Sequence, residues 1–93
     1  IVCSNDHTAA LLLQQLAKIG VQVPQEIRVT GFDDVRFATL VSPPLTTIHQ
    51  PYREIASTAF RTMMERIATP QIPARQINLA PRLVIRSSCG AYL

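Results

Sequence analysis

Residues 1–34 read IVCSNDHTAALLLQQLAKIGVQVPQEIRVTGFDD, and this stretch decides the fold. A short apolar run at 1–4 is followed by a polar turn, an amphipathic segment that ends at Gly20, and a second run at 27–32 that is rich in β-branched residues. A strand, a helix and a strand within roughly 30 residues predict a βαβ unit, whose two strands lie parallel and are joined by a right-handed crossover. The sequence therefore predicts an α/β fold built on a parallel sheet.

The helix of this unit has clear start and stop signals. Ser4, Asn5 and Asp6 are residue types that accept hydrogen bonds from the free amides of a first helical turn. Gly20 is suited to the left-handed conformation that ends a helix. The apolar positions recur at spacings of three and four, at Ala9, Leu12, Leu13, Leu16, Ala17 and Ile19. Leu11 does not fit this stripe, because it projects from the polar side of the helix.

The rest of the chain alternates short strands with one long helix. We expect a helical turn at 35–41, a third strand at 45–49, a helix from Pro51 to 68, and two short strands at 76–80 and 82–87 around Pro81. The long helix carries one apolar stripe, which predicts a core-facing side: Tyr52, Ile55, Ala56, Ala59, Phe60, Met63, Met64 and Ile67.

Length and composition exclude several classes of protein. The 93 residues support one domain or less, no apolar run is long enough to cross a bilayer, and the opening on an apolar strand suggests a piece of a longer polypeptide. The net charge is +3, but the nine Lys and Arg residues are spread along the chain, so no nucleic-acid surface is predicted. Cys3 and Cys89 fit neither a disulfide framework nor a zinc site, so we expect reduced thiols, a cytoplasmic setting and no cofactor.

Polar residues follow the first two predicted strands. Asn5 and Asp6 come after the first strand, and Asp33 and Asp34 come after the second. In parallel α/β sheets ligands bind beyond the carboxyl ends of the strands, and amide and carboxylate groups suit a ligand with vicinal hydroxyls. The structural alternatives remain open, since Asn5 or Asp6 can simply cap the helix and the Asp pair can be a solvated strand end.

A catalytic or metal site is the weaker interpretation. Successive residues of a strand point to opposite faces, so Asp33 and Asp34 would not flank one bond. No phosphate loop, nucleophile elbow or zinc motif accompanies them, and His7 and His49 lack the spacing of a metal-ligand set. We therefore expect a binding protein and not an enzyme.

Several motifs, in order and at matching spacings, resemble the LacI/GalR family of bacterial transcription regulators over nearly the whole chain. They are Ser4-Asn5-Asp6, Val23-Pro24, Gly31-Phe32-Asp33-Asp34, Pro43-Pro44-Leu45-Thr46-Thr47-Ile48, Gln50-Pro51 and Leu83-Val84-Ile85-Arg86-Ser87-Ser88. The resemblance implies a periplasmic-binding-protein-like type I core of two α/β lobes that clamp a small effector. Residues 1–93 would be the C-terminal portion of this effector-binding and dimerisation core, without the DNA-binding helix-turn-helix.

The same resemblance implies roles for particular residues. Effector contacts are expected at Asn5, Asp33, Gln50 and Tyr52, while Asp34 is expected to be structural. The dimer interface is expected to use the first helix and the segment after the Asp pair, through Ala10, Leu11, Phe37, Leu40 and Val41. This role accounts for the apolar Leu11 on the polar side of its helix.

The implied partners are a small-molecule effector (a sugar, a sugar phosphate or a nucleoside-like compound), a second copy of the chain, and DNA only through the missing N-terminal domain. Effector binding would shift the balance between two lobe arrangements. An alternative is a periplasmic sugar-binding protein of an ABC transporter, which shares the two-lobe core, and a third possibility is a carbohydrate-active enzyme. A helix-turn-helix or a signal peptide upstream would separate the first two.

Overall fold

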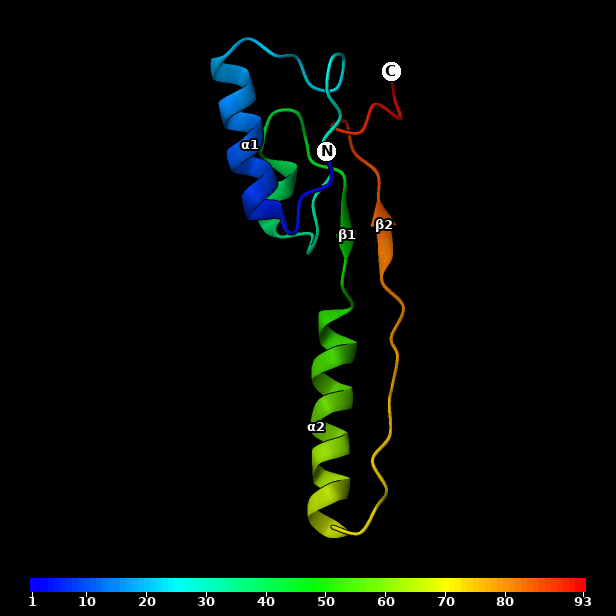
Figure 1. The fold of residues 1–93 in the computed structure, drawn as a ribbon. Coiled ribbons are helices and arrows are strands. Elements are labelled where there is room, and N and C mark those ends of the chain that lie inside the picture. The colour runs from blue at the N-terminus through cyan, green and yellow to red at the C-terminus, as the bar shows by residue number, and fades with distance from the viewer. The chain divides into compact units, whose positions relative to one another are not determined.

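The computed structural model describes all residues from 1 to 93. Its elements, in chain order, are α1 (Asp6–Lys18), the 3-10 helix η1 (Arg36–Thr39), β1 (Thr47–His49), α2 (Tyr52–Ala68) and β2 (Arg82–Val84) (Figure 1). The chain divides into two compact units, the first made of Ile1–Gln50 with Arg82–Leu93 and the second of Pro51–Pro81. None of its helices is both long enough and apolar enough to span a bilayer.

Parallel pairing in the first unit confirms the predicted βαβ arrangement. Val2 and Thr30 form a parallel bridge, as predicted, and Thr30 forms another with Thr46, so a third segment lies parallel beside the first two. Backbone hydrogen bonds connect them, from Cys3 N–H to the Thr30 carbonyl at 2.9 Å and from Gly31 N–H to the Thr46 carbonyl at 2.9 Å. The first two segments pair only through isolated bridges, so the full strands predicted at 1–4 and 27–32 are reduced to short stretches.

The predicted strands at 45–49 and 82–87 are also shorter in the structure. β1 and β2 pair antiparallel, with Thr47 opposite Val84 and His49 opposite Arg82. The chain leaves the first unit directly after β1 and returns to it directly at β2. β1 therefore precedes the second unit in the chain, and β2 follows it.

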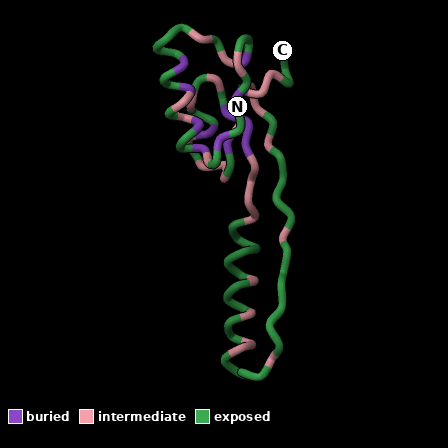
Figure 2. Tube along the Cα trace, in the orientation of Figure 1, coloured by how far each residue is buried: buried purple, intermediate pink, exposed green.

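A small core holds the first unit together. Figure 2 shows its buried residues gathered between α1 and the paired segments, and the apolar ones are Cys3, Ala9, Leu13, Leu16, Val29, Ala38 and Leu45. Three of these residues lie on α1 at the predicted spacing, which confirms that part of the predicted stripe, whereas Ala17 and Ile19 of the same stripe are exposed. Gly20 follows the helix with a φ of 79°, as its predicted role at the helix end requires.

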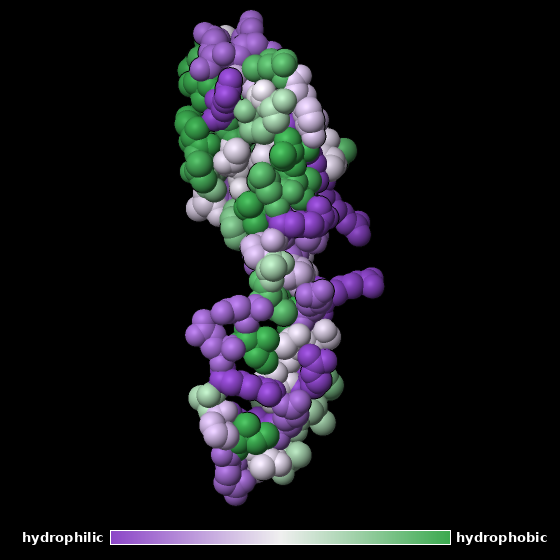
Figure 3. Space-filling view, turned by 90° about the vertical axis from the view of Figure 1, so that its right-hand side faces the viewer, coloured by the Kyte–Doolittle hydropathy of each residue, from purple (hydrophilic) through white to green (hydrophobic).

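The second unit has no buried core. α2 contains no buried residue, and Phe60, Met63, Met64 and Ile67 of the predicted core stripe are all exposed. Figure 3 shows apolar side chains on its surface among polar ones. The prediction that this stripe forms core is therefore wrong for residues 1–93, because the unit holds one helix and one extended segment, too little chain to cover the stripe. The strand predicted at 76–80 is also absent, since the segment has no backbone ladder partner.

Candidate functional site

The carboxyl ends of the parallel segments lie next to one another in the first unit. The Asp6 N–H donates to the Phe32 carbonyl at 2.9 Å, which joins the start of α1 to the end of the second segment. Asp33 in turn forms a parallel bridge with His49, at the end of β1. The carboxyl ends of three paired segments therefore lie at one edge, which is where an open α/β sheet binds its ligands.

Asn5 is the N-cap of α1. Its backbone is extended, and its side-chain oxygen accepts a hydrogen bond from the Thr8 N–H at 2.8 Å. The capping alternative considered for this residue is thus confirmed. The cap uses the amide oxygen as an acceptor, and the Nδ2 group can still donate to a ligand.

Asp6, the first residue of α1, is fully buried. Its Oδ1 accepts from the Thr47 hydroxyl at 2.5 Å and its Oδ2 accepts from the Val35 N–H at 2.9 Å. A buried carboxylate is tolerated when its oxygens are hydrogen-bonded in this way. Asp6 therefore ties α1 to β1 and to the segment after the Asp pair, and it does not face a ligand.

Asp33 and Gln50 are brought together by the fold. The Gln50 Nε2 group donates to Asp33 Oδ1 at 2.7 Å, and both residues are partly buried. A carboxylate and an amide in contact offer acceptors and a donor within one small area, which suits the hydroxyls of a sugar or ribose ring. This pair is the polar centre of the candidate site.

Asp34 turns the other way, toward two cationic or ionisable side chains. Arg86 Nη2 donates to its Oδ1 at 2.7 Å, and His49 Nδ1 lies 2.8 Å from its Oδ2. Burial alone would raise the pKa of Asp34, but the hydrogen bonds and charges of Arg86 and His49 together lower the pKa below its ordinary value. Asp34 therefore remains ionised at neutral pH as part of the framework, in keeping with the structural role expected for it.

The supporting roles of Asp6, His49 and Arg86 were not predicted from the sequence. The sequence indicated Asp6 only as a cap or a ligand contact, His49 only as a residue outside any metal-ligand set, and Arg86 only as part of a motif. The available signal was an arginine inside an otherwise apolar strand pattern, because such a charge needs a carboxylate partner when it is buried. The partner, Asp34, lies 52 residues away in the chain, and spacing alone could not identify it.

Tyr52 is the first residue of α2 and belongs to the second unit, whereas Asn5, Asp33 and Gln50 belong to the first. Its side chain is about half exposed. Its role as an effector contact remains a prediction from the resemblance.

An apolar groove in the first unit runs between α1 and η1. It brings together four of the five residues expected at a dimer interface, Ala10, Leu11, Phe37 and Val41. The fifth, Leu40, does not line this groove, but its side chain is 81% exposed next to Val41. The His7 ring packs edge-on against Phe37 at one end, with the ring centroids 6.4 Å apart.

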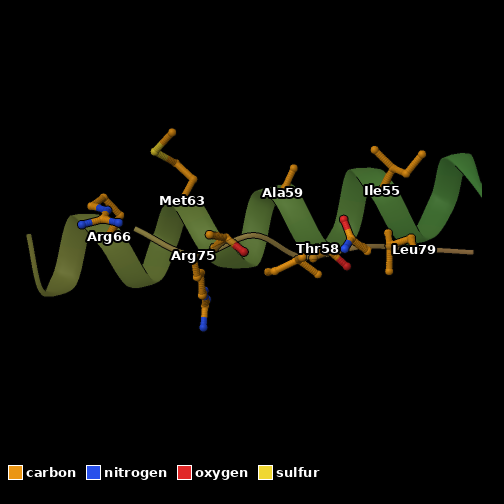
Figure 4. A pocket seen from close by; sticks show the side chains of 10 residues that line it. Ile55, Thr58, Ala59, Met63, Arg66, Arg75 and Leu79 are labelled. Carbon is orange, nitrogen blue, oxygen red and sulfur yellow. The ribbon is translucent and has the colours of Figure 1, made fainter. Parts of the chain in front are cut away.

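A second groove lies on the helical unit. Ile55, Ala59 and Met63 project from the same side of α2, and the extended segment that carries Arg75 and Leu79 runs beside the helix (Figure 4). Neither groove includes Asn5, Asp33 or Gln50 among its lining residues. The polar pair and the two apolar surfaces are therefore separate features of the chain.

Comparison with known proteins agrees with this geometry. The family model for a periplasmic binding protein-like domain matches residues 1–89. The chain belongs to this family. The resemblance to LacI-type regulators is confirmed as well, since the curated relatives and solved neighbours are proteins of that kind.

Three similar proteins illustrate the relationship. The HTH-type transcriptional repressor PurR of Vibrio vulnificus is 39% identical over 88 residues, which are 95% of this chain and 26% of that protein. A LacI-type transcription regulator from Bifidobacterium animalis subsp. lactis has 39% identity and a TM-score of 0.86, over 95% of this chain and 31% of its own. A LacI family regulator from Enterococcus faecalis V583, solved with bound ribose, has 36% identity and a TM-score of 0.84, over 90% and 32%. The chain thus spans about a quarter to a third of the proteins that it matches.

Proposed function

We propose that residues 1–93 are part of the effector-sensing and dimerisation core of a LacI-type transcription repressor that acts in the cytoplasm. The observation that carries the proposal is the hydrogen bond between Gln50 Nε2 and Asp33 Oδ1, formed where the parallel segments end. DNA would be bound outside this chain, by the helix-turn-helix of the whole protein.

The proposed effector is a small polyhydroxylated molecule, a sugar, a sugar phosphate or a nucleoside-like compound. Asp33 would accept hydrogen bonds from vicinal hydroxyls, Gln50 would donate and accept, and the Nδ2 group of Asn5 would donate beside them. Tyr52 would add an apolar face for the ring, as the resemblance implies. The ribose bound to the Enterococcus faecalis relative supports a ligand of this chemistry.

We further propose that the α1–η1 groove is part of a homodimer interface. Exposed apolar side chains around a groove are typical of surfaces that meet a partner. Effector binding would favour one arrangement of the whole core over another and so change the spacing of the paired DNA-binding heads. The difference in effector affinity between the two arrangements would be the only driving force.

The effector proposal is tested by calorimetric titration of the full-length protein with ribose, ribose 5-phosphate and adenosine. We expect one of these to bind, and Asp33→Ala to weaken its binding at least tenfold, because the carboxylate hydrogen bonds to the ligand are lost. Glu54→Ala, which removes an exposed carboxylate from α2, is the matched control and should leave the affinity unchanged. An unchanged affinity in Asp33→Ala would show that this residue does not contact the effector.

Two further measurements separate the proposal from its rivals. A repressor binds its effector without converting it, so the compound recovered after incubation should be unaltered. Effector-dependent release from or binding to operator DNA would distinguish a repressor from a periplasmic sugar-binding protein of the same fold. Binding without any effect on DNA would favour the transport protein.

A further inference from the structure

The turn that carries Asp33 is held in an unfavourable backbone conformation. Asp33 has a φ of 110° and Asp34 a φ of 55°, and both are non-glycine residues. A positive φ is unfavourable for a residue with a side chain, and such conformations persist only when the surrounding structure fixes them. Two strained residues in succession therefore require specific contacts to hold them.

Those contacts are concentrated on the carboxylate of Asp34. Arg86 Nη2 donates to one of its oxygens at 2.7 Å and His49 Nδ1 to the other at 2.8 Å. The backbone N–H of Asp34 lies 3.3 Å from the Thr47 hydroxyl oxygen, its acceptor. Both carboxylate oxygens and the backbone are thus restrained at the residue next to Asp33.

Arg86 is itself fixed at both ends. Its Nη1 group donates to the Leu45 carbonyl at 2.9 Å, and its backbone N–H donates to the Thr46 hydroxyl at 2.9 Å. The side chains of Arg86 and Asp34 are only 18% and 13% exposed, so the ion pair is little screened by water. Arg86, in the C-terminal segment, therefore restrains the turn, and Arg86 is not itself one of the expected effector contacts.

This restraint has a direct consequence for the candidate site. Asp33 accepts from Gln50 at 2.7 Å only while the turn keeps its present course, because relaxation to a negative φ would redirect the Asp33 side chain. A carboxylate that must meet ligand hydroxyls loses affinity when it is no longer held in the productive geometry.

We propose that Arg86 and His49 are positioning residues, which hold the strained Asp33–Asp34 turn through the Asp34 carboxylate and so keep Asp33 and Gln50 in place for the effector. The effector part of this inference rests on the function proposed above. The turn itself is a property of the ligand-free protein, and the two can be tested separately.

The first test measures amide hydrogen exchange in the full-length protein without ligand. The N–H groups of Asp33 and Val35 donate to the Ile48 carbonyl and to Asp6 Oδ2, so they report on the turn from both sides. We expect Arg86→Met to speed exchange at 33–35 at least tenfold while protection within α1 is unchanged. Arg86→Lys, which keeps the charge but not the fork of donors, should fall between wild type and Arg86→Met.

Two control variants separate positioning from general destabilisation. Leu16→Ala opens the buried core of the same unit away from the turn, and it should lower the melting temperature without selective exchange at 33–35. Arg28→Met removes an exposed arginine of the same unit and should change neither quantity. If Arg86→Met raises exchange in α1 as much as at 33–35, or leaves 33–35 unchanged, the positioning role is rejected.

The second test is titration of the same variants with ribose. Arg86→Met and His49→Ala should weaken binding at least tenfold, whereas Leu16→Ala and Arg28→Met should bind like wild type at a temperature where all are folded. Affinity lost equally in Leu16→Ala would reject positioning in favour of a stability effect. If the wild-type protein does not bind ribose, then ribose is not its effector. The exchange measurement, which needs no ligand, still decides whether Arg86 holds the turn.

Discussion

Asp6 shows how one side chain can connect several segments of this chain. It is fully buried, and its two oxygens accept from Thr47 and from the Val35 N–H. Gly31 passes so close that a Cβ built on it would lie 2.3 Å from Asp6 Oδ1 and 3.0 Å from Leu45 Cδ2. The glycine is therefore required by the close approach of a carboxylate that has no freedom to move aside.

This close approach predicts the effect of adding a methyl group. Gly31→Ala should lower the free energy of unfolding by about 2–3 kcal/mol, because the buried Asp6 must leave its partners to make room. The measurement is the urea midpoint of the full-length protein. Gly20→Ala is the matched control: nothing lies within 4 Å of its Cβ position, so only the strain of a positive φ remains, about 1 kcal/mol. Equal losses in the two variants would contradict the steric argument.

The lowered pKa of Asp34 predicts a pH dependence of stability. Since its pKa in the folded chain lies below the ordinary value of 3.8, ionised Asp34 stabilises the fold above that pH, and this contribution is lost as pH falls through the lowered folded value. Asp34→Asn should therefore be less stable than wild type near neutral pH, by about 1–3 kcal/mol, and the gap should shrink below about pH 4.

Denaturant titrations at a series of pH values would measure this gap. Repeating them on a His49→Gln background removes the imidazole, so that only the pair of Asp34 and Arg86 contributes. Glu54→Gln, which changes an exposed carboxylate of α2, should show no gap at any pH. A difference between Asp34→Asn and wild type that is as large at pH 3 as at pH 6 would rule out the charge as its cause.

Among the elements, α1 combines a structural and a proposed binding role at its first turn. Asn5 caps the helix through its oxygen, and its nitrogen is the group proposed to meet the effector. Asn5→Asp keeps the capping oxygen but loses the donor, so we expect unchanged stability and effector affinity reduced about tenfold. Asn5→Ala should also lose about 1 kcal/mol of stability, measured by thermal melting. Full affinity in Asn5→Asp would limit this residue to its cap.

Local patterns predicted the elements better than their partners. The spacing of Ala9, Leu13 and Leu16 located the buried face of α1, and the order of strand, helix and strand gave the parallel pairing. The ion pair of Asp34 with Arg86 joins residues 52 apart in the chain, and spacing carries no information about such a contact. The periodicity of the apolar residues correctly predicted the helix α2. It could not predict their burial, because burial depends on what covers the apolar face, and residues 51–81 provide only one extended segment besides the helix.

At the scale of the whole molecule, the pair of Asp33 and Gln50 is separate from the α1–η1 groove, so an effect of ligand binding must be transmitted from one to the other. Asp33 and Gln50 lie at the carboxyl ends of the parallel segments, and the groove residues lie on α1, on η1 and just after η1. The Val35 N–H donates to Asp6 at the start of α1, so the strained turn is tied directly to both walls of the groove. A change at Asp33 could thus reach the proposed interface through one buried carboxylate.

The interface itself predicts the oligomeric state. Leu11 is 50% exposed on the groove wall, so Leu11→Glu leaves the core of the subunit intact but places an unpaired carboxylate where the partner subunit would bury it. Such a charge costs several kcal/mol, and we expect the dimer dissociation constant of the full-length protein to rise at least 100-fold, measured by sedimentation equilibrium. Gln25→Glu adds the same charge to an exposed position of the first unit away from α1 and outside the groove, and it should remain dimeric. If both variants dissociate, net charge and not the groove controls assembly; if both stay dimeric at the same concentration, the partner subunit binds to another surface and Leu11 has no part in the interface.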